Sequence, residues 1–380
     1  MKIVICPDSF KESLPADAAA QAIAEGVREL WPDAECVCLP LADGGEGTLD
    51  ALVSATGGQL LRHTVRGPLG APVDARFAVL GDGETALIEM AEAAGLMRIP
   101  RSERDPLRAS TYGVGELIAA ALAQGARRIL LGLGGSATQD GGAGMLQALG
   151  ALLLDANKQP IGAGGGCLQD LAAIDLSGLD KRLADVEIVV ACDVDNPLCG
   201  EKGASAVFGP QKGATAEMVQ ALDSGLQHFA ALAARDLGLD IQSPAGAGAA
   251  GGMGGGVLLL PDARLQAGVK IVMEAVGLAE KVQDADLVIT GEGRMDAQSV
   301  HGKTPIGVAH TAKAFGKPVI AIVGCLREDY EVVYAQGIDA VFPIIRQLGS
   351  LEEILQHGRD NLVSAAQNVA RIYQMGISRK

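Results

Sequence analysis

The chain has 380 residues, of which 48% are hydrophobic and 20% charged, and its formal net charge is −15. This length is typical of two domains, each with a sizeable core. The acidic balance argues against nucleic acid and anionic membrane surfaces as partners, because both favour clustered Lys and Arg.

The seven cysteines show no metal-binding spacing of the CxxC type, and their odd number is typical of reduced thiols in the cytosol. The N-terminal residues MKIVICPDS are typical of a strand, not of a signal peptide. No apolar run approaches the roughly 20 residues needed to span a bilayer. The sequence therefore predicts a cytoplasmic protein.

The chain opens with a predicted βα unit. Residues 2–6 are a short apolar run of the kind found in buried parallel strands, and Pro15 stands in the first turn of the helix that follows. A second strand over 35–39 leads into the loop at 41–47. Beyond it, residues 60–66 and 73–80 flank the turn GPLG and predict a β-hairpin, which residues 84–89 extend.

The middle of the chain contains helices and glycine clusters. The clearest unit is a strand at 128–131, a glycine loop at 132–144 and a helix through Leu149; a further strand is predicted at 187–191. The glycine stretch at 245–256 fits either a hinge or a backbone that faces a ligand.

The last third returns to regular alternation, with strands predicted at 287–290, 319–323 and 340–344 and one long amphipathic helix from Leu351. Because both ends of the chain show the doubly wound pattern, we expect one parallel α/β domain built from residues 1–74 and 264–380. A second α/β domain is inserted at 75–263.

Ligands of open α/β sheets bind beyond the carboxyl ends of the strands, so polar loops directly after strands are the candidate sites. Five loops qualify, at 7–13, 41–47, 133–142, 192–200 and 290–305.

Two motifs in these loops match well-known nucleotide sites only loosely. Residues 132–137 fit GxGxxG/A, but the loop continues into further glycines and the next apolar run is short, which disfavours a dehydrogenase. Gly302-Lys303-Thr304 resembles the end of a Walker A loop, yet Ala297 stands where its first glycine is required.

Loop 133–142 has the character of a phosphate-binding loop at a helix N-terminus. Its candidate phosphate ligands are Gly134, Gly135, Ser136 and Thr138, and Lys212, bounded by glycines, is a further basic candidate. The alternative is a tight turn between strand and helix with no ligand.

Mg²⁺ typically takes one or two carboxylates together with phosphate oxygens and waters. Asp193 and Asp296 follow predicted strands and are the candidates to hold Mg²⁺, and either could instead accept a substrate proton. The alternative for each is a helix cap or an Asx turn.

An acidic substrate needs hydroxyl, amide and ammonium donors. The expected substrate-binding residues are Ser9, Lys11, Asp43, Gly44, Ser299 and Lys303, and Lys11 is also counted with Asp193 and Asp296 as catalytic. A surface lysine such as Lys11 is often merely solvated.

Taken together, these motifs resemble the bacterial type-one glycerate kinases, in order and from end to end. The matching segments are PDSFKES at 7–13, ADGGEGT at 42–48, GGSATQDGGAGM at 134–145, ACDVDNPL at 191–198, FGPQKGA at 208–214, GAGAAGGMGGG at 246–256 and TGEGRMDAQSVHGKTPIGVA at 290–309.

The resemblance implies Mg²⁺-dependent phosphorylation of D-glycerate by ATP, with 2-phosphoglycerate as the product. It also implies a Rossmann-like domain from both termini, an inserted α/β domain, and a site in the cleft between them. Three positions depart from the family's usual residues: Asp195 stands for Thr, Gln139 for Asn, and Pro15 for Ser. A kinase for another small hydroxy acid, or a nucleotide-binding regulator without turnover, are the competing hypotheses.

Overall fold

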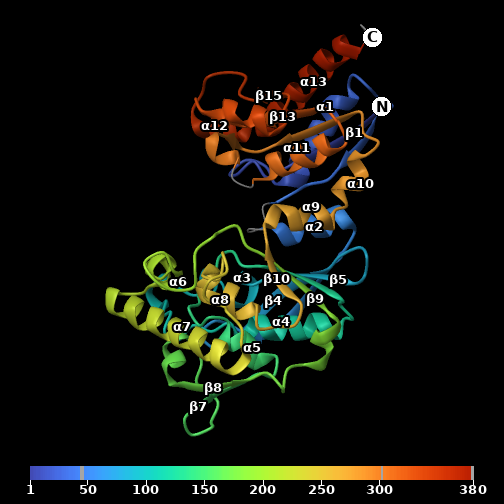
Figure 1. Ribbon diagram of the computed structural model, residues 1–380. Coiled ribbons are helices and arrows are strands. Elements are labelled where there is room, and N and C mark those ends of the chain that lie inside the picture. The colour runs from blue at the N-terminus through green and yellow to red at the C-terminus, as the bar shows by residue number, and fades with distance from the viewer. Residues whose placement is uncertain (43–46, 301–302, 378–380) are drawn as a thin grey trace. The chain divides into compact units, whose positions relative to one another are not determined.

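The computed structural model describes residues 1–42, 47–300 and 303–377, and the chain divides into two compact units (Figure 1). The terminal unit comprises Met1–Asp43, Asp50–Thr56 and Val269–Lys380, and the inserted unit comprises Gly44–Leu49 and Gly57–Gly268. An α/β chain with parallel sheets is thus confirmed.

The terminal unit is built on a five-stranded parallel sheet in the order β15-β13-β11-β1-β2. Its strands come from both ends of the chain: β1 (Lys2–Pro7), β2 (Glu35–Cys38), β11 (Leu287–Gly291), β13 (Val319–Val323) and β15 (Ala340–Pro343). The central strands are continuous apolar runs because helices cover both faces of a parallel sheet. The predicted assembly of one sheet from both termini is confirmed.

One face of this sheet packs against α1 (Ala16–Arg28) and α13 (Gly358–Ile377), which share a core with Ile3 and Ile5 of β1. The two helices approach closely at Gly26, where a Cβ atom would lie 2.3 Å from the carbonyl oxygen of Val363. The opposite face carries α11 (Thr304–Ala314), which contacts β1, β11 and β13. The smaller elements that lie wholly or mostly in this unit are α2 (Thr48–Thr56), α9 (Gly268–Ala275), α10 (Leu278–Val282), β12 (Arg294–Met295), η6 (Ala297–Val300), β14 (Cys325–Leu326) and η7 (Tyr330–Gln336).

The single C-terminal helix predicted from periodicity is wrong in one respect, because His357 separates α12 (Leu351–Gln356) from α13. The break occurs where the chain meets the loop after β1. A Cβ atom on Gly358 would lie 2.1 Å from Ser13 Oγ, and Ser13 Oγ donates a hydrogen bond to the carbonyl oxygen of Leu355 at 2.8 Å.

The inserted unit contains a six-stranded sheet in the order β10-β9-β6-β5-β4-β3. Its strands are β3 (Gln59–Arg66), β4 (Pro72–Val79), β5 (Thr85–Glu89), β6 (Arg128–Gly132), β9 (Glu187–Ala191) and β10 (Ala263–Gln266). The predicted hairpin is confirmed as the antiparallel pair β3–β4, and β5, β6, β9 and β10 run parallel. The main segment of this unit, Gly57–Gly268, extends beyond the expected range 75–263 at both ends. Residue 75 lies inside β4, and β10, which begins at residue 263, pairs with β9 of the same sheet.

The helices of the inserted unit surround one large apolar core. They are α3 (Ala91–Ala94), η1 (Leu96–Arg98), η2 (Arg101–Glu103), α4 (Tyr112–Ala123), α5 (Ala143–Ala148), α6 (Ala204–Phe208), η5 (Pro210–Lys212), α7 (Ala216–Leu237) and α8 (Ala249–Val257), with a small β7–β8 hairpin (Leu152–Asp155, Leu171–Asp175) and two further 3-10 turns (Gly165–Asp170, Lys181–Asp185).

The glycine stretch that could have been a hinge or a ligand-facing backbone is buried throughout 249–257. It packs against the backbone of loop 133–142. A Cβ atom on Gly251 would lie 1.9 Å from the carbonyl oxygen of Thr138, and one on Gly256 would lie 2.0 Å from that of Gly141. These glycines therefore permit backbone-to-backbone packing beneath the loop.

None of the helices in the described ranges is long and apolar enough to cross a membrane.

Candidate active site

The order of the five-stranded sheet reverses between β1 and β11. The chain passes from β1 to β2 on one side, and then to β11, β13 and β15 on the other. Pro7 and Gly291, the last residues of β1 and β11, are paired in register, so the loops that follow them begin side by side. This is the switch point at which open α/β sheets bind their ligands.

The loop after β1 is tied to the segment after β11 through Asp8. Its backbone N–H donates to the carbonyl oxygen of Gly291 at 2.8 Å, and its Oδ2 accepts a hydrogen bond from Thr304 Oγ1 at 2.9 Å. Its Oδ1 accepts the N–H of half-buried Ser9 at 2.6 Å. Lys11 is exposed and forms no ion pair with any described residue.

The segment after β11 forms a buried network of charges. Glu292 accepts a hydrogen bond from Ser299 Oγ at 2.6 Å and one from Lys303 Nζ at 3.2 Å. Lys303 Nζ also lies 3.9 Å from Asp296, whose carboxylate is 3.3 Å from Arg294 Nε. Asp296 is 3% exposed and Ser299 is fully buried. One ammonium group thus lies near two carboxylates, and the hydroxyl of Ser299, which donates to Glu292, also accepts the backbone N–H of Asp296 at 3.2 Å.

Burial raises the pKa of Glu292 above its ordinary range, and the nearby charge of Asp8 raises it further. The hydrogen bonds from Ser299 and Lys303 oppose this shift without cancelling it. A carboxyl group that is easier to protonate than usual, next to a lysine, is a common feature of sites where protons and charges are moved.

Of the residues predicted from the sequence, the structure brings Ser9, Lys11, Asp296, Ser299 and Lys303 onto loops that follow these two neighbouring strands. Asp43 and Gly44 lie outside the described residues. Sequence reasoning missed Asp8, Glu292 and Thr304, although each adjoins a selected residue or loop. Their signal was position, since Asp8 and Glu292 are the first residues after their strands.

The second candidate loop, 133–142, follows β6 in the inserted unit. Gly134 and Gly135 are exposed, and Gly135 adopts a φ of +71°. The N–H of Leu96 donates to the carbonyl oxygen of Gly135 at 2.8 Å, and the N–H of Ala137 donates to that of Ala94 at 2.9 Å. Ser136 and Thr138 point into the protein, so the exposed part of the loop is its glycine pair.

The helix that follows this loop does not offer a free N-terminus. The buried carboxylate of Asp140 accepts the N–H groups of Gly142 and Gly144 at 3.2 and 3.3 Å, and the N–H and Oγ1 of Thr111 at 2.8 and 2.9 Å. Burial raises the pKa of Asp140, while these donors lower it. Asp140 therefore takes the place at the start of α5 that the sequence suggested for a phosphate, and both it and Thr111 were missed.

Lys212 and Asp193, both predicted to contact a ligand, form hydrogen bonds to other parts of the protein. Lys212 is 2% exposed, and its Nζ donates to Ser136 Oγ at 2.7 Å and to the carbonyl oxygen of Thr138 at 2.8 Å. Asp193 is exposed two residues beyond β9, and its Oδ1 accepts the N–H of Gly268, the first residue of α9, at 2.8 Å. The capping role considered for Asp193 is thus present, in the inserted unit, whereas Asp296 belongs to the terminal unit.

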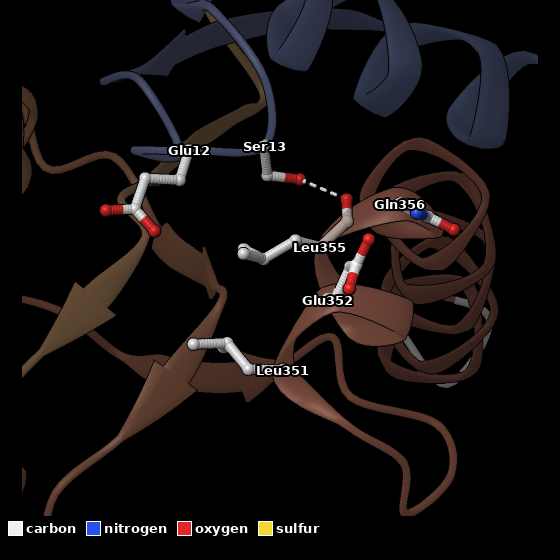
Figure 2. A pocket seen from close by; sticks show the side chains of 6 residues that line it. All are labelled: Glu12, Ser13, Leu351, Glu352, Leu355 and Gln356. Atoms are coloured by element: carbon white, nitrogen blue, oxygen red, sulfur yellow. Dashed lines mark hydrogen bonds between the residues drawn. The ribbon is translucent and has the colours of Figure 1, made fainter.

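A cavity of about 600 Å³ opens beside the loop after β1 (Figure 2). Leu351 and Leu355 of α12 lie across from Glu12 and Ser13. Among the described residues that line it, the charged ones are Glu12 and Glu352, so an anionic ligand would meet repulsion there. This cavity is therefore a poor candidate for the site of an acidic substrate.

Within 1–42, 47–300 and 303–377, no three His, Cys, Asp or Glu side chains are grouped to hold a metal ion. All seven cysteines are free thiols. The carboxylate oxygens of Asp193 and Asp296 suit Mg²⁺, which needs only one or two such ligands when phosphate oxygens complete its shell.

Comparison with known proteins accounts for nearly the whole chain. The model of the glycerate kinase family matches residues 3–374. The glycerate kinase of Haemophilus influenzae is 61% identical over 372 residues, covering 98% of both chains. The glycerate 2-kinase of Escherichia coli is 53% identical over 377 residues, covering 99% of both.

The same likeness holds in three dimensions. A crystal structure from Salmonella typhimurium LT2, provisionally named glycerate kinase 2, superposes with a TM-score of 0.91 at 53% identity and covers 100% of this chain and 99% of its own. The family resemblance read from the motifs is confirmed, and the chain belongs to the glycerate kinase family.

Proposed function

We propose that the chain transfers the γ-phosphoryl group of ATP to the 2-hydroxyl of D-glycerate, giving 2-phosphoglycerate and ADP. The observation that carries this proposal is the network of Asp8, Glu292, Asp296, Ser299 and Lys303 at the switch point of the terminal sheet. Family membership and the name of the 53% identical relative support the choice of glycerate and of its 2-hydroxyl.

Phosphoryl transfer requires positioning and charge stabilisation more than covalent chemistry. The glycerate hydroxyl oxygen attacks the γ-phosphorus, the bond to the β–γ bridging oxygen breaks, and the hydroxyl proton passes to a carboxylate. Asp296 and Asp193 are the candidates to accept that proton. Lys11 and Lys303 supply ammonium groups for the carboxylate of glycerate, with Ser9 and Ser299 as hydroxyl donors.

Asp193 and Asp296 would also be the residues to hold Mg²⁺. The ion, when bound, neutralises charge on the phosphate oxygens of ATP. In the inserted unit, exposed Gly134 and Gly135 are the phosphate-binding candidates of loop 133–142, and buried Ser136, Thr138 and Lys212 support them from within.

Identifying the product tests both the kinase reaction and the hydroxyl group that is phosphorylated. Purified chain is incubated with D-glycerate and ATP with Mg²⁺, and ADP release is followed through pyruvate kinase and lactate dehydrogenase. Enolase added without phosphoglycerate mutase converts only 2-phosphoglycerate, so the position of phosphorylation is read directly. Absence of ADP above the ATPase background would contradict the kinase activity, and a product inert to enolase would contradict phosphorylation at the 2-hydroxyl.

Two further experiments test the acceptor and the metal ion. L-glycerate, lactate and tartrate are tested as alternative acceptors in the same assay. Omission of Mg²⁺ with added EDTA tests whether the reaction requires the ion.

A further inference from the structure

Lys212 is a lysine whose side chain lies inside the protein. It ends the short η5 turn and is 2% exposed, whereas lysines are almost never buried unless they are paired. Its ammonium donates to Ser136 Oγ at 2.7 Å and to the carbonyl oxygen of Thr138 at 2.8 Å. Both acceptors are neutral and belong to loop 133–142.

The charge of Lys212 is incompletely balanced. No carboxylate among the described residues lies within ion-pairing distance of its Nζ. The carboxylate that acts on it, Asp140, is occupied by four donors of Thr111, Gly142 and Gly144. Burial lowers the pKa of Lys212 to about 7, although Asp140 raises it. An additional negative charge close to the loop would therefore favour the protonated ammonium.

Few other charges surround this lysine. Helix α6, which packs against η5, has the sequence ASAVF and no titratable side chain. Arg104 Nη1 donates to the carbonyl oxygen of the neighbouring Gln211 at 3.2 Å. Asp140 is thus the charged group that acts on the protonation of Lys212, and it opposes the effect of burial.

On its inner side, the loop has a buried hydroxyl group that makes no hydrogen bond with a described residue. Thr138 Oγ1 is buried and has no hydrogen-bond partner among the described residues. On the outer side, Gly134 and Gly135 are exposed, two residues or fewer from the Ser136 hydroxyl that Lys212 holds. Lys212 therefore contacts the loop from inside, and a ligand would contact it from outside.

We propose that Lys212 is a positioning residue for the phosphate-binding loop, and that binding of the ATP phosphates at Gly134 and Gly135 draws a proton from solvent onto its neutral amine, which becomes the ammonium. The inference rests on the proposed function, because it takes ATP as the anion that loop 133–142 binds. Lys212 holds the loop through Ser136 and Thr138, and the bound phosphates supply the negative charge that this buried site lacks.

Proton uptake distinguishes this role from a purely structural one. ATP with Mg²⁺ is titrated calorimetrically into the full chain at pH 7.5 in PIPES, HEPES and Tris, whose ionisation enthalpies differ. The slope of the binding enthalpy against the ionisation enthalpy gives the protons taken up. We expect the wild type to take up about half a proton or more per ATP, and less at pH 6, where Lys212 is already protonated.

Two variants and one control make the assignment specific. Lys212→Met should abolish the uptake and weaken ATP binding about tenfold or more, because the loop loses its inner anchor. Lys212→Arg keeps the charge permanently, so it should bind ATP without uptake. Lys202→Met changes an exposed lysine of the same region and should leave the uptake unchanged. Folding of each variant is checked by circular dichroism.

The outcomes separate this inference from the proposed function. ATP binding with the same uptake in Lys212→Met or Lys212→Arg as in the wild type would overturn the inference and leave the kinase proposal standing. A wild type that binds ATP without any uptake at pH 7.5 would also overturn it, even if neither variant folds. Proton uptake with ATP but no turnover of glycerate would support the role of Lys212 and contradict the proposed function. No ATP binding at all would overturn both.

Discussion

Among single residues, the two candidate aspartates have different surroundings. Asp296 is buried, 3.3 Å from Arg294 Nε and 3.9 Å from Lys303 Nζ. Asp193 is exposed and caps the first turn of α9 through the N–H of Gly268. Removing the charge of Asp296 therefore alters a network of paired groups, whereas removing that of Asp193 leaves an amide oxygen that can still accept the same hydrogen bond.

We predict that Asp193→Asn and Asp296→Asn each lower kcat by about 10²–10⁴-fold, the usual cost of losing a catalytic base or a charge-stabilising group. The enolase-coupled assay measures kcat, and circular dichroism confirms that each variant folds. Asp195→Asn, two residues from Asp193 and also exposed, is the matched control and should change kcat by less than about threefold. Turnover near that of the wild type in either variant would remove that aspartate from the catalytic residues.

At the scale of elements, α8 and loop 133–142 depend on glycines for their contact. Gly251 has a φ of +71°, and a Cβ atom there would lie 1.9 Å from the carbonyl oxygen of Thr138. Gly238, which ends α7, has a φ of +69° with no atom within 4 Å of the Cβ position. The two glycines share one backbone conformation and differ in the space around them.

This pair separates backbone strain from steric clash. We predict that Gly238→Ala lowers the free energy of unfolding by about 1 kcal/mol, the cost of a left-handed conformation for alanine. Gly251→Ala should cost about 2 kcal/mol more, because the Thr138 carbonyl and the loop must move. Thermal unfolding followed by circular dichroism measures both changes. Equal losses of unfolding free energy in the two variants would show that loop 133–142 moves away from the new Cβ atom without an energetic cost, and would contradict the prediction.

The elements themselves were largely predictable, because each central strand is an apolar run and each loop follows it directly. The strand at 187–191 and the switch point between β1 and β11 follow from that pattern. The domain boundaries were less accessible, since the strand at 73–80 has the same local pattern whichever sheet it joins. Its pairing with β5 of the inserted unit is a tertiary fact.

Side-chain partners far apart in sequence were not predictable. Lys212 meets Ser136 across 76 residues, and Asp140 meets Thr111 across 29. Nothing in the local sequence shows that Ser136 and Thr138 point inward, or that Asp140 occupies the start of α5. The sequence therefore indicated which loops matter, while the structure showed which atoms of those loops remain exposed.

For the whole molecule, stability and pH are linked through Lys212. Burial lowers the pKa of its ammonium from 10.5 to about 7 in the folded chain. Between these values the unfolded chain holds a proton that the folded chain has released, so unfolding takes up a proton and stability rises with pH. The cost of burying this group is largest below pH 7, where it corresponds to about 5 kcal/mol, and it disappears above pH 10.5.

We therefore predict that the wild type gains about 2 kcal/mol in stability relative to Lys212→Met between pH 7 and pH 9, because the variant has no ammonium to titrate. Urea unfolding of both proteins at pH 6, 7, 8 and 9, without ATP, measures the difference, and Lys202→Met controls for the loss of an exposed lysine. The difference should be flat from pH 5 to pH 6, where Lys212 is protonated in both the folded and the unfolded chain. A difference that does not change between pH 7 and pH 9 would mean that Lys212 keeps its proton in the folded protein. The uptake of a proton with ATP would then have no source at this residue.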